Sequence, residues 1–85
     1  MLMKNTPHPG EVLNSFLKKN KLSIAKAAAE IGLSRQTLSS IVNGKSSINA
    51  HTAIRLANAF KTSEMFWMNL QARHELSLAI QEDER

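Results

Sequence analysis

Apolar side chains recur every three or four residues along most of the chain, which is the period of an amphipathic α-helix. Strand-like alternation of apolar and polar residues is missing throughout. The pattern predicts five consecutive helices, at about residues 9–20, 24–31, 35–43, 50–60 and 64–81. Because the connections between them are short, we expect the whole chain, residues 1–85, to form one compact all-α domain.

Residues typical of helix ends support these boundaries. Pro9 suits the first position of a helix, and Glu11 suits its positive end. Gly32 and Gly44 suit the residue after a helix, because glycine adopts the left-handed conformation at little cost. The predicted N-caps are residues with a short polar side chain: Ser23, Ser34, Asn49, and Thr62 or Ser63.

The connection between the second and third predicted helices has the features of a steep helix crossing. Two helices can cross around three or four turn residues only if the contact residue on the first helix is small and the turn tolerates a positive φ. Ala28 and Gly32 meet these two needs. Residues 24–43 therefore match a helix-turn-helix, in which the helix at 35–43 is the recognition helix.

The predicted recognition helix is unusually polar on one side. At 100° per residue, Leu38, Ile41 and Val42 lie together and uncharged hydrogen-bonding side chains lie opposite. Arginine pairs with guanine, glutamine with adenine, and serine or threonine with either, whereas a merely solvated face usually carries Glu and Lys. The residues that we expect to contact DNA bases are Arg35, Gln36, Thr37, Ser39 and Ser40.

The helix starts and the turn after the recognition helix carry residues that suit a phosphate backbone. Hydroxyl and amide groups, lysines and free backbone N–H groups all favour phosphate oxygens. The predicted phosphate contacts are Ser23, Lys26, Ser34, Asn43, Lys45 and Ser46. The alternative is that the turn is only a glycine-terminated helix end with solvated serines.

Charge is distributed unevenly along the chain. Residues 1–62 carry nine Lys or Arg and two Glu, a net +7, whereas residues 63–85 carry two Arg and five Asp or Glu, a net −3. A basic body favours a polyanionic partner such as double-stranded DNA, although ordinary solvated lysines would give the same count.

The last predicted helix is too apolar for a single buried stripe. One band comprises Met65, Met68, Ala72, Leu76, Ala79 and Ile80, and a second comprises Phe66, Trp67, Leu70 and Leu78. We expect one band to pack on the domain and the other to form the interface of a homodimer, for which the last helix is extended. Such a dimer would read a palindromic operator. The predicted dimer contacts are Trp67, Leu70, His74 and Leu78, the alternative being that both bands are buried within one monomer.

Several sequence stretches carry a family resemblance. The stretch from Ile24 to Lys45 resembles the phage repressor and Cro class, often called the XRE family, which has a lambda-repressor-like five-helix fold. A narrower similarity to the HigA group of antitoxins rests on HPGEVL at 8–13, SRQTLSSIVNGK at 34–45, AIRLANAF at 53–60 and FWMNLQARHEL at 66–76. The sequence departs from the family pattern at Ile24, Lys61 and Glu64, where Gln, Gly and Pro are expected.

The resemblance implies an antitoxin of a type II toxin–antitoxin system. Such a protein binds its operator as a dimer, represses its own operon and neutralises a cognate toxin that cleaves mRNA, of the RelE or HigB kind. Two alternatives remain open. The chain could be a stand-alone phage-like transcriptional repressor, or a protein-interaction module without specific DNA binding.

The sequence argues against other classes of function. Cysteine is absent, and His8, His51 and His74 lack zinc-ligand spacing, so we expect no metal and no cofactor. No catalytic spacing of Ser, His and Asp occurs, and we do not expect an enzyme. No segment resembles a signal peptide or a membrane span, so we expect a soluble, cytoplasmic protein that makes no membrane contact.

Overall fold

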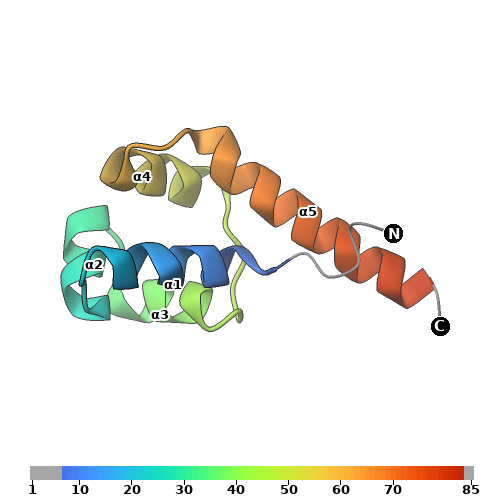
Figure 1. Ribbon diagram of the computed structural model, residues 1–85, viewed down its shortest axis with the longest axis horizontal. Helices are drawn as coiled ribbons and strands as arrows, with labels where there is room; N and C mark the ends of the chain where they lie inside the picture. The colour runs from blue at the N-terminus through green and yellow to red at the C-terminus, as the bar shows by residue number, and fades with distance from the viewer. Residues whose placement is uncertain (1–6, 84–85) are drawn as a thin grey trace.

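The computed structural model describes residues 7–83 and contains all five predicted helices, with no strand in that part of the chain (Figure 1). They are α1 (Pro9–Lys19), α2 (Ile24–Ile31), α3 (Arg35–Val42), α4 (Ala50–Phe60) and α5 (Glu64–Asp83). Every predicted boundary lies within two residues of the observed one. The all-α fold class is therefore confirmed.

The five helices form a compact group from which one end of α5 projects. α1 packs against α3 on one side and α5 on the other, and α4 makes its most extensive contact with α5. In Figure 1 the C-terminal half of α5 extends past the other helices, and the molecule measures 41 × 21 × 21 Å. Among residues 7–83 no helix combines the length and apolar character that a membrane span requires.

The N-caps form as the sequence predicts. The side chains of Ser23, Ser34 and Asn49 each accept a hydrogen bond from the backbone N–H three residues later. At the start of α5 the two candidates, Thr62 and Ser63, accept different hydrogen bonds. Ser63 Oγ accepts the N–H of Phe66 at 3.0 Å, while Thr62 Oγ1 accepts the indole N–H of Trp67 at 2.7 Å.

Trp67 occupies the centre of the core, and its predicted place in a dimer interface is wrong. The side chain is 0% exposed and lies edge-on to Phe16 and Phe66, at ring-centroid distances of 5.4 and 5.1 Å. Leu70 is half-buried against the same core, and the His74 ring lies 4.7 Å from the ring of His8. An indole removes more apolar surface from water than any other side chain here, so this face of α5 packs on its own domain.

The face of α5 that remains uncovered carries four residues of the other band, whereas Met68 of that band packs against the core. Met65 and Leu76 are 60% and 50% exposed, and Ala72 and Ala79 are exposed on the same side of the helix. Leu78, the fourth predicted dimer contact, is 46% exposed and remains a prediction. One apolar face of α5 therefore packs on the domain, and a second apolar face lies open to solvent.

The turn from α1 to α2 contains a strained lysine. Lys21 has φ 55°, in the left-handed region, and is exposed. A hydrogen bond holds the turn against the end of α1: the backbone N–H of Leu22 donates to the carbonyl of Leu17 at 2.9 Å. A side chain in this conformation costs about 1 kcal/mol relative to glycine.

A Lys21→Gly variant is therefore expected to be more stable than the parent chain. The relief of strain exceeds the extra entropy of the unfolded glycine, leaving a net gain of about 0.5 kcal/mol, or about 3 °C in melting temperature. Thermal unfolding followed by circular dichroism measures the shift. Ala29→Gly, at an exposed position inside α2, is the control and should lower stability by about 1 kcal/mol. A loss of stability in both variants would contradict the strain argument.

Candidate nucleic-acid interface

The α2–α3 corner has the geometry that the sequence predicts. Gly32 has φ 90°, and the backbone N–H groups of Gly32 and Leu33 both donate to the carbonyl of Ala28, at 2.9 and 3.0 Å. Ala28 is 2% exposed, which lets the two helices approach closely. Leu38 and Ile41 point inward from α3 and are fully buried. The orientation of α3 is thus fixed by its apolar side, and its polar side faces away from the core.

The five predicted base-contact residues divide into two groups. Arg35, Gln36 and Thr37, in the first turn of α3, are exposed, whereas Ser39 and Ser40 are half-buried. The hydroxyl of Ser34 accepts the backbone N–H of Thr37 at 3.0 Å and donates to Thr37 Oγ1 at 2.8 Å. The first turn of α3 is therefore the part of the helix most open to a partner, and its hydroxyl groups are held in place before any partner binds.

The predicted phosphate contacts lie at the start of α2 and in the turn after α3. Asn43 and Lys45 are exposed, and Ser46 is half-buried. The carbonyl of Ser40 accepts the backbone N–H groups of Lys45 and Ser46, at 2.8 and 3.2 Å, so the turn folds back on the end of α3. Ser23, Lys26 and Ser34 are also exposed, and the structure leaves these six assignments as predictions.

His8, to which the sequence analysis gave no site role, holds the turn after α3 to the start of α1. Its ring Nδ1 accepts the backbone N–H of Gly10 at 2.8 Å, and its backbone N–H donates to Glu11 Oε2 at 3.3 Å. These two bonds form a capping box. The His8 ring also makes a backbone hydrogen bond with Ser46. The HPGE motif was the available signal, but histidine is an uncommon N-cap and the spacing alone does not show its partner.

Gly10 brings the start of α1 against the end of the recognition helix. A Cβ atom at this position would lie 1.9 Å from the carbonyl oxygen of Ile41. Gly10 is buried, and the atom that it faces belongs to backbone rather than to a flexible side chain. Only glycine allows this approach, so the glycine of HPGE is a packing requirement.

Gln71 anchors the other end of the turn that follows α3. Its Oε1 accepts the backbone N–H of Ile48 at 2.8 Å, and its Nε2 donates to Glu75 Oε2 at 3.0 Å. The side chain is 5% exposed, so the amide is buried with both ends paired. The segment between α3 and α4 is therefore held by His8 on one side and by α5 on the other. No local pattern of residues indicates this long-range bond.

Burial and the neighbouring His74 lower the pKa of His8 below its ordinary value, against a smaller opposing effect of Glu11. The cause agrees with the geometry, because Nδ1 can accept the N–H of Gly10 only when it carries no proton. Since the folded state holds His8 neutral, the unfolded state binds more protons as the pH falls through the unperturbed pKa near 6.5.

The free energy of unfolding is accordingly expected to fall as the pH is lowered from 7.5 to 5.5. The contribution of His8 to stability is fully present above its unperturbed pKa. His8→Asn should keep an N-cap without a titrating group and flatten this part of the pH profile. Melting temperatures at intervals across the range measure the effect. An equally steep profile in the variant would assign the dependence to another group.

Residues 13–67 match the helix-turn-helix family, and the chain belongs to that family, in its XRE-type branch. Among curated proteins, the virulence-associated protein A' of Dichelobacter nodosus is 43% identical over 76 residues, which cover 88% of this chain and 66% of that protein. The chain therefore spans slightly less than two thirds of this relative.

Solved structures of HigA-family antitoxins are similar over nearly the whole chain. The Pseudomonas aeruginosa antitoxin HigA, solved with the higBA promoter, is 38% identical with a TM-score of 0.89, over 94% of this chain and 88% of that one. A HigA-family addiction module antidote protein from Coxiella burnetii is 35% identical with a TM-score of 0.88, over 93% and 87%. The lambda-repressor-like fold expected from the sequence is thereby confirmed.

The described residues at this site present hydrogen-bonding side chains. Between residues 7 and 83, no three or more His, Asp or Glu side chains are grouped so that they could hold a metal ion. The polar groups on α3 and its flanking turns are hydrogen-bond donors and acceptors. The arrangement is suited to binding.

Proposed function

We propose that this protein is a DNA-binding antitoxin that represses its own operon and neutralises a RelE- or HigB-like toxin that cleaves mRNA. The observation that carries the DNA-binding part is the exposed first turn of α3. There Arg35, Gln36 and Thr37 face outward, while Leu38 and Ile41 fix the helix from behind. This is the end of a recognition helix that enters the major groove. The solved relative with its promoter DNA supports the same assignment.

The base contacts proposed are Arg35, Gln36, Thr37, Ser39 and Ser40, with phosphate contacts from Ser23, Lys26, Ser34, Asn43, Lys45 and Ser46. Asn43 Nδ2 donates to Ser39 Oγ at 3.2 Å, so these two residues reach DNA as a linked pair. The net charge of +7 over residues 1–62 supplies the electrostatic attraction that does not depend on sequence.

Footprinting of the purified protein on DNA upstream of its own gene tests the repressor role. The expected result is a protected palindrome with half-sites one helical turn apart. Co-expression with the product of the neighbouring reading frame tests the antitoxin role, and rescue of growth is expected. A footprint without rescue would favour a stand-alone repressor, and rescue without a footprint would favour a protein-interaction module.

The homodimer is proposed to form through the exposed face of α5 rather than through Trp67. Met65, Ala72, Leu76 and Ala79 form an apolar strip that the described part of the domain does not cover. Ala72, near the centre of the strip, and Ala79, at its end, are small and allow two helices to approach closely. Burial of this strip against a second copy would give a twofold dimer. Its two recognition helices would then bind the two half-sites of a palindromic operator.

Leu76→Asp is expected to weaken the dimer at least tenfold without unfolding the monomer. The leucine is half exposed, and its burial between two copies is worth about 2 kcal/mol. Sedimentation equilibrium measures the dissociation constant, and circular dichroism checks the fold. Ile54→Asp, which changes an exposed apolar residue on α4, is the control and should leave the dimer intact. Equal weakening by both would argue against the α5 face.

A further inference from the structure

A surface groove lies between the C-terminal ends of α1 and α4, on the side of α1 away from α3. Its volume is about 510 Å³, and its floor is formed by Phe16 and Phe60, whose ring centroids lie 5.3 Å apart in an edge-on arrangement. Phe66, which is 38% exposed, continues the same aromatic surface at 6.2 Å from the ring of Phe16. The three phenylalanines of the chain therefore meet beside this groove, and none of them is fully buried.

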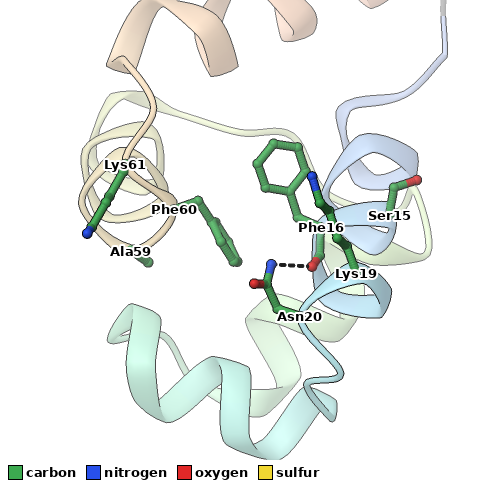
Figure 2. Close-up of a pocket in the computed structure, with 7 residues that line it drawn as sticks. All are labelled: Ser15, Phe16, Lys19, Asn20, Ala59, Phe60 and Lys61. Carbon is green, nitrogen blue, oxygen red and sulfur yellow. Dashed lines mark hydrogen bonds between the residues drawn. The ribbon is translucent and has the colours of Figure 1, made fainter.

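Two lysines flank the groove. Lys19 lies on its α1 side and Lys61 on its α4 side, and both are exposed, as Figure 2 shows. Within residues 7–83 neither ammonium group has an ion-pair or hydrogen-bond partner, and no acidic side chain lines the groove. An aromatic floor edged by two cations fits an apolar side chain accompanied by carboxylates.

Both helix ends that form the groove are fixed by contacts within the domain. Asn20 Nδ2 donates to the carbonyl of Phe16 at 2.8 Å, shown dashed in Figure 2, and the backbone N–H of Lys61 donates to the carbonyl four residues before it. Behind the floor, the rings of Phe16 and Phe60 lie 5.4 and 6.5 Å from that of the buried Trp67. A partner therefore meets a surface that is formed before it binds, which limits the entropic cost of association.

The acidic end of α5 cannot reach the groove of its own molecule. In Figure 1 the two lie at opposite ends, because α5 is one continuous helix of 20 residues that leads away from α4. Residues 1–6 carry a lysine and no acidic side chain, so they lack the charge that the groove requires. The complementary segment therefore belongs to another molecule.

The proposed function gives this protein three partners, and two of them have surfaces elsewhere. None of the seven residues that line the groove belongs to the apolar strip of α5 or to the predicted DNA contacts. Duplex DNA brings phosphates to a binding surface but no apolar side chain for an aromatic floor. The toxin is the partner that remains without an assigned surface.

We propose that the groove is the docking site for the toxin, and that it takes a toxin segment in which an apolar side chain is flanked by Asp or Glu. The apolar side chain packs on Phe16 and Phe60, and the carboxylates pair with Lys19 and Lys61. This inference rests on the antitoxin role in the proposed function. Because the groove lies apart from α3 and from the strip on α5, the toxin binds without displacing the operator or the second copy.

Charge reversal at the groove tests the site. The groove variant is Lys19→Glu/Lys61→Glu, and Lys26→Glu/Lys45→Glu is the matched control, because it makes the same charge change at two predicted phosphate contacts. A third variant, Ala59→Trp, fills the groove from an exposed position of α4 without changing the charge. The probes are the purified product of the neighbouring reading frame, titrated by calorimetry, and the operator duplex, titrated by fluorescence anisotropy.

The groove variant is expected to bind the toxin about 100-fold more weakly than the parent chain, because each carboxylate then faces a like charge. Its operator affinity should stay within about threefold of the parent, since salt at about 0.15 M screens charges beyond about 8 Å, and this binding also shows that the variant is folded. The control should show the reverse pattern, losing the operator and keeping the toxin. Ala59→Trp should weaken toxin binding about tenfold and leave operator binding unchanged.

Other outcomes overturn the proposal in distinguishable ways. If the folded groove variant binds the toxin like the parent, the toxin docks elsewhere. If the groove variant is monomeric in sedimentation equilibrium, the groove is a contact between two copies of this chain. If charge reversal weakens toxin binding and Ala59→Trp does not, the lysines attract the toxin and no apolar side chain enters the groove. A parent chain that neither binds the product of the neighbouring reading frame nor rescues growth overturns the antitoxin role together with this docking site.

Discussion

An Arg35→Ala/Gln36→Ala double variant is expected to bind its operator about 100-fold more weakly than the parent chain, with its fold and dimer unchanged. Both side chains are exposed in the first turn of α3 and contribute nothing to the core. Each bidentate pairing with a base is worth about 1 to 3 kcal/mol of discrimination. Because their contacts are to bases, the loss should be large for the operator and small for unrelated DNA. Fluorescence anisotropy with both kinds of duplex measures the difference.

Lys45→Ala is the matched comparison for this experiment. The lysine is exposed in the turn after α3, and we propose that it contacts a phosphate. It should weaken binding to all duplexes alike and reduce the slope of log affinity against log salt by about one. If the double variant also lost affinity uniformly, Arg35 and Gln36 would be backbone contacts, and the bases would be recognised elsewhere.

Gly10→Ala is expected to lower the free energy of unfolding by about 3 kcal/mol and the melting temperature by about 15 °C. In an ordinary helix the same change is favourable by about 1 kcal/mol, so the sign of the effect is informative. The added Cβ would lie 1.9 Å from the carbonyl oxygen of Ile41, and neither backbone can yield without moving a helix. Chemical denaturation followed by circular dichroism measures the loss.

Ser15→Ala, at an exposed position of the same helix, is the control and should be neutral or slightly stabilising. The Gly10 variant should also bind the operator less well under conditions where it remains folded, because Ile41 belongs to the recognition helix. A stable Gly10→Ala protein would show that α1 can shift away from α3 at little cost, which would contradict the close contact described above.

Most of the fold could be predicted because its determinants are local. Each helix carries an apolar stripe at helical spacing, and each boundary carries a residue whose preference does not depend on distant contacts. Ser23, Ser34 and Asn49 cap their helices, and Gly32 and Gly44 adopt positive φ, as their residue types indicate. The direction of the polar face of α3 follows in the same way, from the position of Leu38 and Ile41.

The partner of each face of α5 could not be predicted from the same kind of information. Both of its bands are apolar, so periodicity alone does not say which packs inward. The choice is made by the cluster of Phe16, Phe60 and Phe66 around Trp67, which forms only when α1, α4 and α5 come together. Sequence reasoning placed Trp67 on the wrong side because its three ring contacts come from three different helices.

The sequence by itself determined five helices, their ends and the exposed polar side of the recognition helix, because short-range propensities and apolar spacing specify these features. Tertiary structure alone decided the burial of Trp67, the bond from Gln71 to Ile48, and the contact of Gly10 with Ile41. Each of these three joins residues that are distant in the chain. Their energies depend on shape and distance between whole helices, which no local pattern of residues encodes.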